Sequence, residues 1–158
     1  MDDLSVTNMK QTFYCKRNPV KGVIFMQSSE NPLRVGDKFE FNGVIYTDKA
    51  FKKPVATATI IYEVGMITQD GVVLETVHKY KFNGIGTNGS LNLKGTVLSP
   101  NFRLKNRTIA PYVTVPENLC VKSGTKDFKM AFGSVKYTVT GPGSGSLNFD
   151  INLLKETN

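Results

Sequence analysis

Apolar and polar residues alternate with a period of two along most of this 158-residue chain, and that alternation constrains the fold more than any other feature. In the clearest run, the positions that form one face are Val72, Leu74, Thr76, His78, Tyr80 and Phe82. Successive side chains of a β-strand point to opposite faces, so this period predicts a strand with one buried side. No segment has a convincing helical period, and we therefore expect an all-β chain.

The same pattern predicts about eight strands with short connections. They cover residues 12–16, 20–26, 38–47, 55–64, 72–82, 91–97, 128–140 and 147–153, and extended structure is also expected at 119–121. Gln69-Asp70-Gly71 predicts a hairpin turn, and a slip of the apolar phase at Gly133 predicts a bulge inside the seventh strand. Strands at such regular spacing predict a closed antiparallel barrel or a sandwich, and closure would remove the exposed edges that favour aggregation.

Residues 99–118 interrupt the alternation. This segment contains Pro100, Pro111 and Pro116, so we expect a long loop with a short strand at 112–115. Such a loop is a candidate lid over one mouth of a barrel. A chain of this length is expected to form one domain, residues 1–158.

The composition excludes several classes of protein. One His and two Cys rule out a site built from several His and Cys ligands, and no metal site is expected. The chain has no Gly-rich phosphate-binding loop, and no apolar run approaches the roughly 20 residues of a membrane helix. The acidic start, Met1-Asp2-Asp3-Leu4, is not a secretory signal, so we expect a cytosolic chain or a mature secreted form.

Basic residues outnumber acidic residues by 20 to 13, which gives a formal net charge of +7. A nucleic-acid-binding protein would need these charges on one face with aromatic side chains for stacking. Lys79 and Lys81 share a strand face, but no aromatic residue lies between them on that face. We therefore expect a solvated coat of lysines and no nucleic-acid partner.

Several segments carry a resemblance to a known superfamily. The stretch from Ser123 to Gly133, SGTKDFKMAFG, resembles the Gly-Gly-Thr-Gly-x-Phe-x-x-Ala-Arg-Gly signature of dirigent proteins, which opens a late barrel strand. Gly36-Asp37 resembles the start of an early strand in both dirigent proteins and allene oxide cyclases. Ile45-Tyr46 followed by Phe51-Lys52-Lys53 is similar to the cyclases, and Thr12-Phe13-Tyr14 is similar to the first dirigent strand.

The resemblance implies a closed eight-stranded antiparallel β-barrel of the calycin-like, dirigent and allene oxide cyclase type. It also implies an apolar substrate in the lumen, no metal or organic cofactor, and a homo-oligomer, either a dimer or a trimer. The chain departs from the family patterns at three positions: Phe132 stands at the dirigent Arg, Gly43 at a water-binding Asn of the cyclases, and Ile61 at a cyclase Cys. The barrel is therefore carried over, but neither specific reaction.

Three residues are candidates for catalysis. His78 lies on an apolar strand face, where a closed barrel would point it inward as a general acid or base. Tyr80 and Tyr62 also lie on apolar faces, where a hydroxyl could stabilise a developing oxyanion. The alternative for all three is a core residue whose polar atom is simply hydrogen-bonded.

Other residues have expected places around these groups. Those predicted to line a substrate site are Phe39, Phe41, Tyr46, Leu74, Phe82, Phe128, Met130, Phe132 and Phe149. Asp48 is expected to hydrogen-bond its own turn, with a proton-accepting carboxylate at a barrel mouth as the alternative. Glu63 is expected to be solvated, with a lumenal position as the alternative. Cys15 and Cys120 are either two buried free thiols or one disulfide.

Three functions remain open at this stage. The first is a cofactor-independent cyclase, isomerase or dirigent-type catalyst that holds an apolar small molecule in the lumen. The second is a noncatalytic carrier for a small hydrophobic ligand in the same barrel. The third hypothesis is a structural or defence protein that acts through its basic outer surface. Its binding to a partner would depend strongly on salt concentration.

Overall fold

The chain folds almost wholly into strands in the computed structural model, which describes residues 3–17, 24–25, 34–84, 87–100, 104–105, 108–109, 115–141 and 143–157. The elements are β1 (Asp3–Arg17), β2 (Ile24–Phe25), β3 (Lys38–Tyr46), β4 (Pro54–Thr68), β5 (Gly71–Gly84), β6 (Thr87–Ser99), β7 (Leu104–Lys105), β8 (Thr108–Ile109), β9 (Glu117–Gly124), the 3₁₀ turn η1 (Lys126–Phe128), β10 (Phe132–Gly141) and β11 (Ser144–Thr157). No helix in these ranges is long and apolar enough to span a bilayer.

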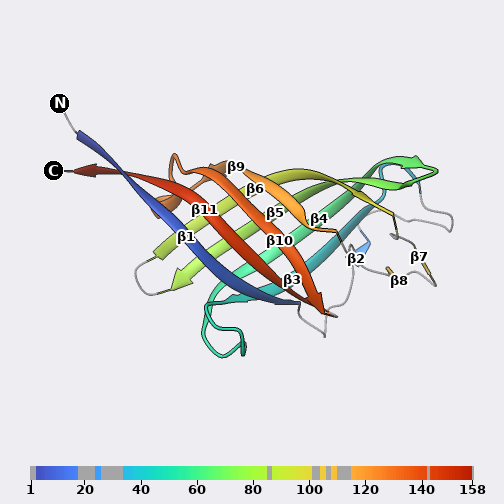
Figure 1. Cartoon of the computed structure of the whole chain (residues 1–158), viewed down its shortest axis with the longest axis horizontal. Coiled ribbons are helices and arrows are strands. Elements are labelled where there is room, and N and C mark those ends of the chain that lie inside the picture. Colours follow the sequence, from blue (N-terminus) through green and yellow to red (C-terminus); the bar gives the residue numbers. More distant parts are fainter. Residues whose placement is uncertain are drawn as a thin grey trace.

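Eight antiparallel strands close into a barrel in the order β1-β11-β10-β9-β6-β5-β4-β3 (Figure 1). The seam is the pairing of β1 with β3, where Tyr14 is opposite Tyr46 and Arg17 is opposite Gly43. β2 also pairs with β3, in addition to the eight barrel strands. β7 and β8 pair with each other in a separate small sheet. The prediction of a closed barrel is confirmed, and the sandwich alternative is excluded.

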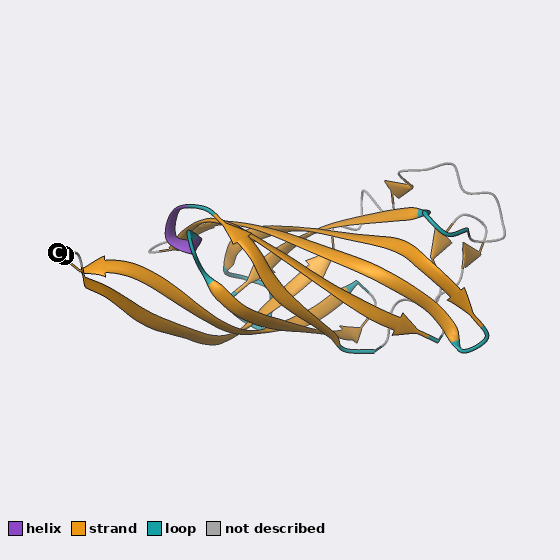
Figure 2. Cartoon of the chain, turned by 90° about the horizontal axis from the view of Figure 1, so that it is seen from above, coloured by secondary structure: helices purple, strands orange, loops and turns teal. Residues whose placement is uncertain are grey.

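The two ends of the barrel carry different segments. The end that we call the termini end holds the start of β1, the end of β11, the end of β5, the start of β6, and η1. There β1 and β11 project as a two-stranded ribbon beyond the other strands (Figures 1 and 2). The opposite, hairpin end holds the β4–β5 turn at Gln69 and Asp70 and the starts of β3 and β9.

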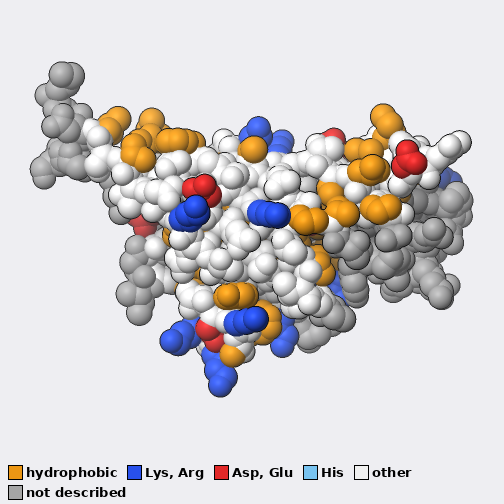
Figure 3. All heavy atoms as spheres, viewed as in Figure 1, with side chains coloured by type: hydrophobic (Ala, Val, Ile, Leu, Met, Phe, Trp, Pro, Cys, Tyr) orange, Lys and Arg blue, Asp and Glu red, His pale blue; other side chains and the backbone are white. Residues whose placement is uncertain are grey.

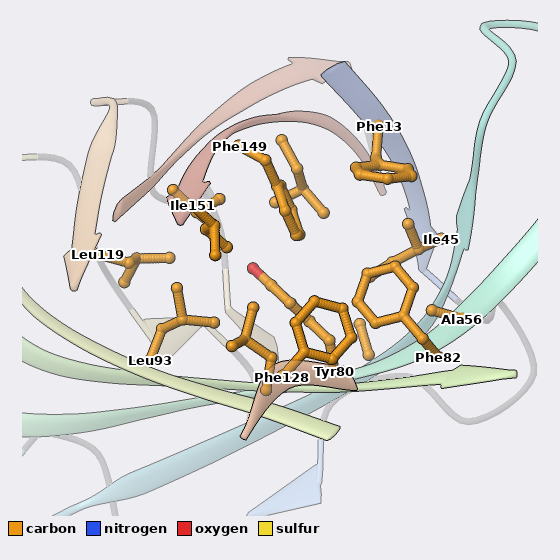
Figure 4. Close-up of a cluster of buried hydrophobic side chains, with 14 of the residues drawn as sticks. Phe13, Ile45, Ala56, Tyr80, Phe82, Leu93, Leu119, Phe128, Phe149 and Ile151 are labelled. Atoms are coloured by element: carbon orange, nitrogen blue, oxygen red, sulfur yellow. The ribbon is translucent and has the colours of Figure 1, made fainter. Parts of the chain in front are cut away.

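The inward faces form two apolar clusters. The larger cluster lies toward the termini end and contains an aromatic group of Phe13, Tyr80, Phe82, Phe128 and Phe149 (Figure 4). The ring centroids of Phe13 and Phe149 are 4.8 Å apart and those of Phe82 and Phe128 are 5.0 Å apart. The smaller cluster lies toward the hairpin end and contains Phe39, Ile60, Tyr62, Val64, Val72, Leu74 and Val97. Burial of each such side chain contributes about 1.5–3 kcal/mol to folding.

The alternation along β5 is confirmed residue by residue. All six predicted inward positions from Val72 to Phe82 are buried, with exposed fractions between 0% and 7%. The hairpin before them is also confirmed: Gly71 has φ +142°, and a Cβ atom there would lie 2.5 Å from the carbonyl oxygen of Ser99. The turn therefore requires glycine.

The prediction for the start of the seventh strand is wrong. Met130 and Phe132 are 65% and 49% exposed, so they do not line the lumen. The chain from Lys126 to Phe128 turns as a 3₁₀ helix, and Met130 has φ +62°, so β10 begins only at Phe132. The bulge predicted at Gly133 is also absent, because Gly133 pairs in register with Ile151 and the irregularity of β10 lies between Val139 and Gly141.

The predicted loop 99–118 is shorter at both ends, because Ser99 still belongs to β6 and Glu117 already belongs to β9. The expected short strand at 112–115 falls mostly outside the described residues. A lid formed by this segment remains a prediction.

The outer surface carries both basic and apolar side chains. Lys and Arg side chains are scattered over the face shown in Figure 3, with a group near the loop between β3 and β4. Within the described ranges, the exposed large hydrophobic residues are Leu4, Val6, Val35, Met66, Ile67, Leu98, Met130 and Phe132.

Candidate functional site

A belt of polar side chains crosses the barrel interior between the two apolar clusters. On the inward face of β5, Thr76 and His78 stand between Leu74 of the smaller cluster and Tyr80 of the larger one. Thr76 is 1% exposed and His78 is 0% exposed. Buried polar groups of this kind need hydrogen-bond partners, because the loss of water contacts is otherwise costly.

Glu117 supplies the charged member of the belt and is 1% exposed. The Tyr62 hydroxyl donates to its Oε2 at 2.7 Å, and the Thr76 hydroxyl donates to its Oε1 at 3.1 Å. Nε2 of His78 lies 3.5 Å from the same Oε1. The carboxylate is therefore held by two hydroxyl donors from β4 and β5 and lies beside the imidazole.

His78 is held from its other side by Tyr80. Nδ1 of His78 and the Tyr80 hydroxyl are 2.6 Å apart, a contact that either imidazole tautomer can make. Nε2 has no hydrogen-bond partner within the described part of the chain. Within the described residues, Nδ1 is thus fixed by Tyr80, whereas Nε2 has only the more distant Glu117 oxygen beside it.

Gly95 explains how Glu117 reaches this position. It is opposite Thr76 on β6, at an inward position of the alternation. A Cβ atom on Gly95 would lie 2.5 Å from the carbonyl oxygen of Asn118 and 3.1 Å from Cδ2 of Leu119. The missing side chain therefore lets β9 approach β6 and brings its first residue into the belt.

The tyrosines of the site remain protonated over a wide pH range. Burial, with the neighbouring Glu117 charge as a further cause, raises the pKa of Tyr62 well above its usual value. Burial likewise raises the pKa of Tyr80. Both hydroxyls therefore keep their protons and can act as hydrogen-bond donors near neutral pH.

Tyr137 of β10 adjoins the belt at its edge. Its ring centroid is 5.3 Å from that of His78. The ring packs on Gly145 of β11, where a Cβ atom would lie 2.5 Å from Cε2 of Tyr137. Burial raises the pKa of Tyr137, with Cys15 and Glu117 as further causes and Arg17 acting in the opposite direction.

The structure brings together the three predicted catalytic residues His78, Tyr80 and Tyr62. The predictions miss Glu117, because it falls within the predicted loop 99–118. A signal for it does exist in the sequence: Glu117, Leu119 and Val121 alternate with polar residues, so a strand extended back to Pro116 places Glu117 inward.

The predicted lining residues divide into three groups. Phe39, Leu74, Phe82, Phe128 and Phe149 are buried in the interior. Phe41 and Tyr46 are half-buried, the first beside Tyr62 and the second beside Phe51 near the β3–β4 turn. Met130 and Phe132 lie on the outside, as described above.

The remaining predictions concern single side chains. The carboxylate of Asp48 accepts hydrogen bonds from the backbone of Lys52 and Lys53, as expected of a turn residue. Glu63 is solvated and lies 3.5 Å from Lys38. Cys15 and Cys120 are both free thiols, the first buried and the second exposed. Among the residues that the structure describes, no group of three His, Cys, Asp or Glu side chains could hold a metal ion.

A cavity of about 170 Å³ opens at the termini end. It is lined by Met9, Gln11, Phe13, Thr47, Val55, Phe82, Gly84 and Thr87. Phe13 and Phe82 also belong to the aromatic group that contains Tyr80 and Phe149, so this group lies between the cavity and His78. The cavity is thus separate from the polar belt.

No protein-family model matches the chain, and no curated protein matches it significantly. Among solved structures, the pterocarpan synthase dirigent protein GePTS1 is similar with a TM-score of 0.63 and 15% identity, over 99% of this chain and 94% of that one. The pterocarpan synthase dirigent protein PsPTS1 has a TM-score of 0.62 and 17% identity, over 100% and 99%. A pyocyanin demethylase has a TM-score of 0.62 and 15% identity, over 94% and 100%. The chain therefore has the dirigent-type barrel fold, and at these identities the likeness extends to the fold alone.

Proposed function

We propose that the chain catalyses proton transfer on an apolar small molecule held in the barrel, in a cyclisation, isomerisation or dirigent-type reaction. The observation that carries this proposal is the pair formed by His78 and Glu117. The imidazole of His78 is buried, and its Nε2 has no hydrogen-bond partner in the described residues. The buried carboxylate of Glu117 lies 3.5 Å from that nitrogen. The named activities of the barrels with this fold, pterocarpan synthase and pyocyanin demethylase, are compatible with a catalyst of this kind.

Each residue has a distinct role in the proposed step. In the tautomer with its proton on Nδ1, His78 donates to the Tyr80 oxygen and presents the Nε2 lone pair as a base. When Nε2 takes a proton from the substrate, the Glu117 carboxylate stabilises the imidazolium that forms. Tyr62 and Thr76 are positioning residues, because their hydroxyls orient that carboxylate.

The apolar surroundings support this chemistry. The clusters on either side of the belt exclude water, and electrostatic interactions are stronger in such an environment than in solvent. A shaped interior would also hold a flexible substrate in one conformation and so remove part of the entropic barrier to ring closure.

The elimination of 5-nitrobenzisoxazole tests the proposal without knowledge of the natural substrate. The base removes the C3 proton, the N–O bond breaks, a nitrile forms, and the electron pair goes to the phenolate oxygen, whose absorbance is followed. General base catalysis contributes about 10²–10⁴-fold. We expect the wild-type chain to accelerate the reaction, and His78→Gln and Glu117→Gln to lower the rate at least about tenfold.

Glu63→Gln is the matched control, since Glu63 is a solvated glutamate on the neighbouring strand β4. Its rate should equal that of the wild type. Equal rates for the wild type, His78→Gln and Glu117→Gln, with all three folded, would refute the proposal. Tight binding of apolar molecules without any turnover would then favour a carrier.

A further inference from the structure

The cavity at the termini end lies where β3 stops and β1 continues. β1 pairs with β3 only from Tyr14 to Arg17, and Tyr14 is opposite Tyr46, the last residue of β3. From Phe13 back to Asp3, β1 pairs with β11 alone among the described strands. The barrel wall is therefore incomplete on this side of β1, and the cavity of about 170 Å³ lies beside the missing pairing.

The inner wall of the cavity is apolar. Phe13 and Phe82 are 4% and 3% exposed, and their rings meet edge to face with centroids 5.7 Å apart (Figure 4). Met9 and Val55 also line the cavity, are half-buried and pack against the same cluster. These four side chains favour contact with an apolar ring over contact with water.

The remaining lining side chains are polar but uncharged. Gln11 contributes an amide, and Thr47 and Thr87 contribute hydroxyl groups. Within the described residues none of these three side chains has a hydrogen bond, and the contact of Thr47 with Lys53 uses its backbone N–H. The lining includes no Lys, Arg, Asp, Glu or His, so it offers no partner for an ionic group.

The volume limits what the cavity can hold. An apolar cavity of about 150 Å³ that was engineered in another protein binds benzene. At about 170 Å³, this cavity has space for one ring with a small substituent. Because no lining side chain is a general acid or base, a molecule bound here should leave chemically unchanged.

We propose that this cavity is a ligand site of its own, which binds a neutral molecule of one ring with a hydrogen-bonding substituent. The ring lies against Phe13 and Phe82, and the substituent faces Gln11, Thr47 and Thr87. The aromatic group separates this site from the polar belt, so the inference goes beyond the proposed function.

Benzyl alcohol and benzoate are the probes, since they have nearly the same size and differ in charge. In ¹H–¹⁵N correlation spectra, benzyl alcohol should shift the backbone amide signals of the lining residues and the side-chain amide signal of Gln11. It should bind at least about tenfold more tightly than benzoate, because a buried charge without a partner is costly.

Gly84→Val narrows the cavity, which Gly84 lines at the end of β5. The backbone of Gly84 is not left-handed, and a Cβ atom there would make an ordinary contact of 3.4 Å with the Val55 side chain. The fold should therefore accept the valine, whose methyl groups take up cavity space. We expect the affinity for benzyl alcohol to fall at least about tenfold. Val55→Phe fills the cavity from β4 and should give the same loss.

Gly65→Val is the matched control. Gly65 lies outside the cavity lining, and a Cβ atom there would have its nearest contact at 3.5 Å. Its affinity for benzyl alcohol should equal that of the wild type. The inference is overturned if benzyl alcohol shifts no signal of a lining residue, if benzoate binds as tightly, or if folded Gly84→Val and Val55→Phe chains keep the wild-type affinity.

Failure of the proposed function and failure of this inference give different results. Glu117→Gln should lose base catalysis and still bind benzyl alcohol as the wild type does, because Glu117 lies in the polar belt and does not line the cavity. Loss of benzyl alcohol binding in that variant, with the chain folded, would contradict a separate site.

Discussion

Nε2 of His78 lies 3.5 Å from Oε1 of Glu117, and both side chains are completely buried. The distance exceeds that of a good N–H···O hydrogen bond, so the two groups are neighbours without being satisfied by each other. A belt that was only structural would be expected to complete its hydrogen bonds, because each buried unsatisfied group costs stability. Among the described residues, the contact with Glu117 therefore leaves Nε2 of His78 without a hydrogen bond.

Removal of the Glu117 carboxylate should expose its structural contribution. In Glu117→Leu the Tyr62 and Thr76 hydroxyls lose their acceptor, at about 1–3 kcal/mol for each unsatisfied group. We expect the free energy of unfolding to fall by about 2–4 kcal/mol in urea denaturation. Glu117→Gln keeps one acceptor oxygen and removes a buried charge, so its change should be within about 1 kcal/mol.

Glu63→Leu serves as the control for this comparison, since Glu63 is solvated and its contact with Lys38 is exposed. Glu63→Leu should lower the free energy of unfolding by less than about 1 kcal/mol. A Glu117→Leu chain as stable as the wild type would contradict the assignment of the two hydroxyl donors.

Alkaline pH should destabilise the barrel through its buried tyrosines. The pKa values of Tyr62, Tyr80 and Tyr137 are raised in the folded state, so their stabilising effect is complete below the unfolded value of about 10. Above that pH the unfolded chain loses protons that the folded chain retains, and stability falls as pH rises. Three such groups give a slope of about 4 kcal/mol per pH unit.

Urea denaturation at pH values from 9 to 12 measures that slope, and absorbance at 295 nm reports tyrosine ionisation. Tyr62→Phe should reduce the slope by about a third, because one titrating group is gone. Ionisation of all tyrosines while the barrel is still folded would contradict the prediction.

The sequence is informative about the site where the alternation is regular and uninformative where it is interrupted. β5 is correctly placed because a strand buried on one side must show a period of two, and this places His78 and Tyr80 inward. Glu117 lies beside a proline-rich segment, and a carboxylate at an inward position contradicts the usual pattern. Its burial depends on donors from β4 and β5, which are distant in sequence.

Backbone conformation explains the error at the start of β10. Phe128, Met130 and Phe132 have the spacing of one strand face, but the 3₁₀ turn at 126–128 and the left-handed conformation of Met130 redirect the chain. Only Phe128 is buried, at 0% exposure. Apolar spacing alone does not reveal such a turn, because it carries no information on φ.

The different burial of Phe128 and Phe132 can be measured by substituting each residue with alanine. Phe128→Ala removes a buried ring that packs 5.0 Å from Phe82 and should lower stability by about 3–5 kcal/mol. Phe132→Ala removes a side chain that is 49% exposed and should cost clearly less. Equal losses in thermal or urea denaturation would place Phe132 back in the core.

The two cysteines should differ in reactivity. Burial raises the pKa of Cys15 to about 12, and its side chain is in the interior, whereas Cys120 is exposed. The thiolate is the reactive form, so a disulfide reagent such as 5,5′-dithiobis(2-nitrobenzoate) should modify one thiol per native chain and both in urea. Cys120→Ser should abolish the native reaction. Rapid modification of Cys15 in that variant would contradict its burial.

Gly95 offers the sharpest test of how the fold creates the site. In Gly95→Ala the new Cβ would lie 2.5 Å from the carbonyl oxygen of Asn118, so β9 must move away and carry Glu117 from His78. Overpacking of this kind costs about 1–3 kcal/mol, and the base-catalysed elimination should fall with it. Gly65→Ala is the matched control, because a Cβ on that β4 glycine has its nearest contact at an ordinary 3.5 Å. Its stability and rate should stay near those of the wild type. A Gly95→Ala chain with the wild-type rate would show that the distance between His78 and Glu117 does not govern proton transfer.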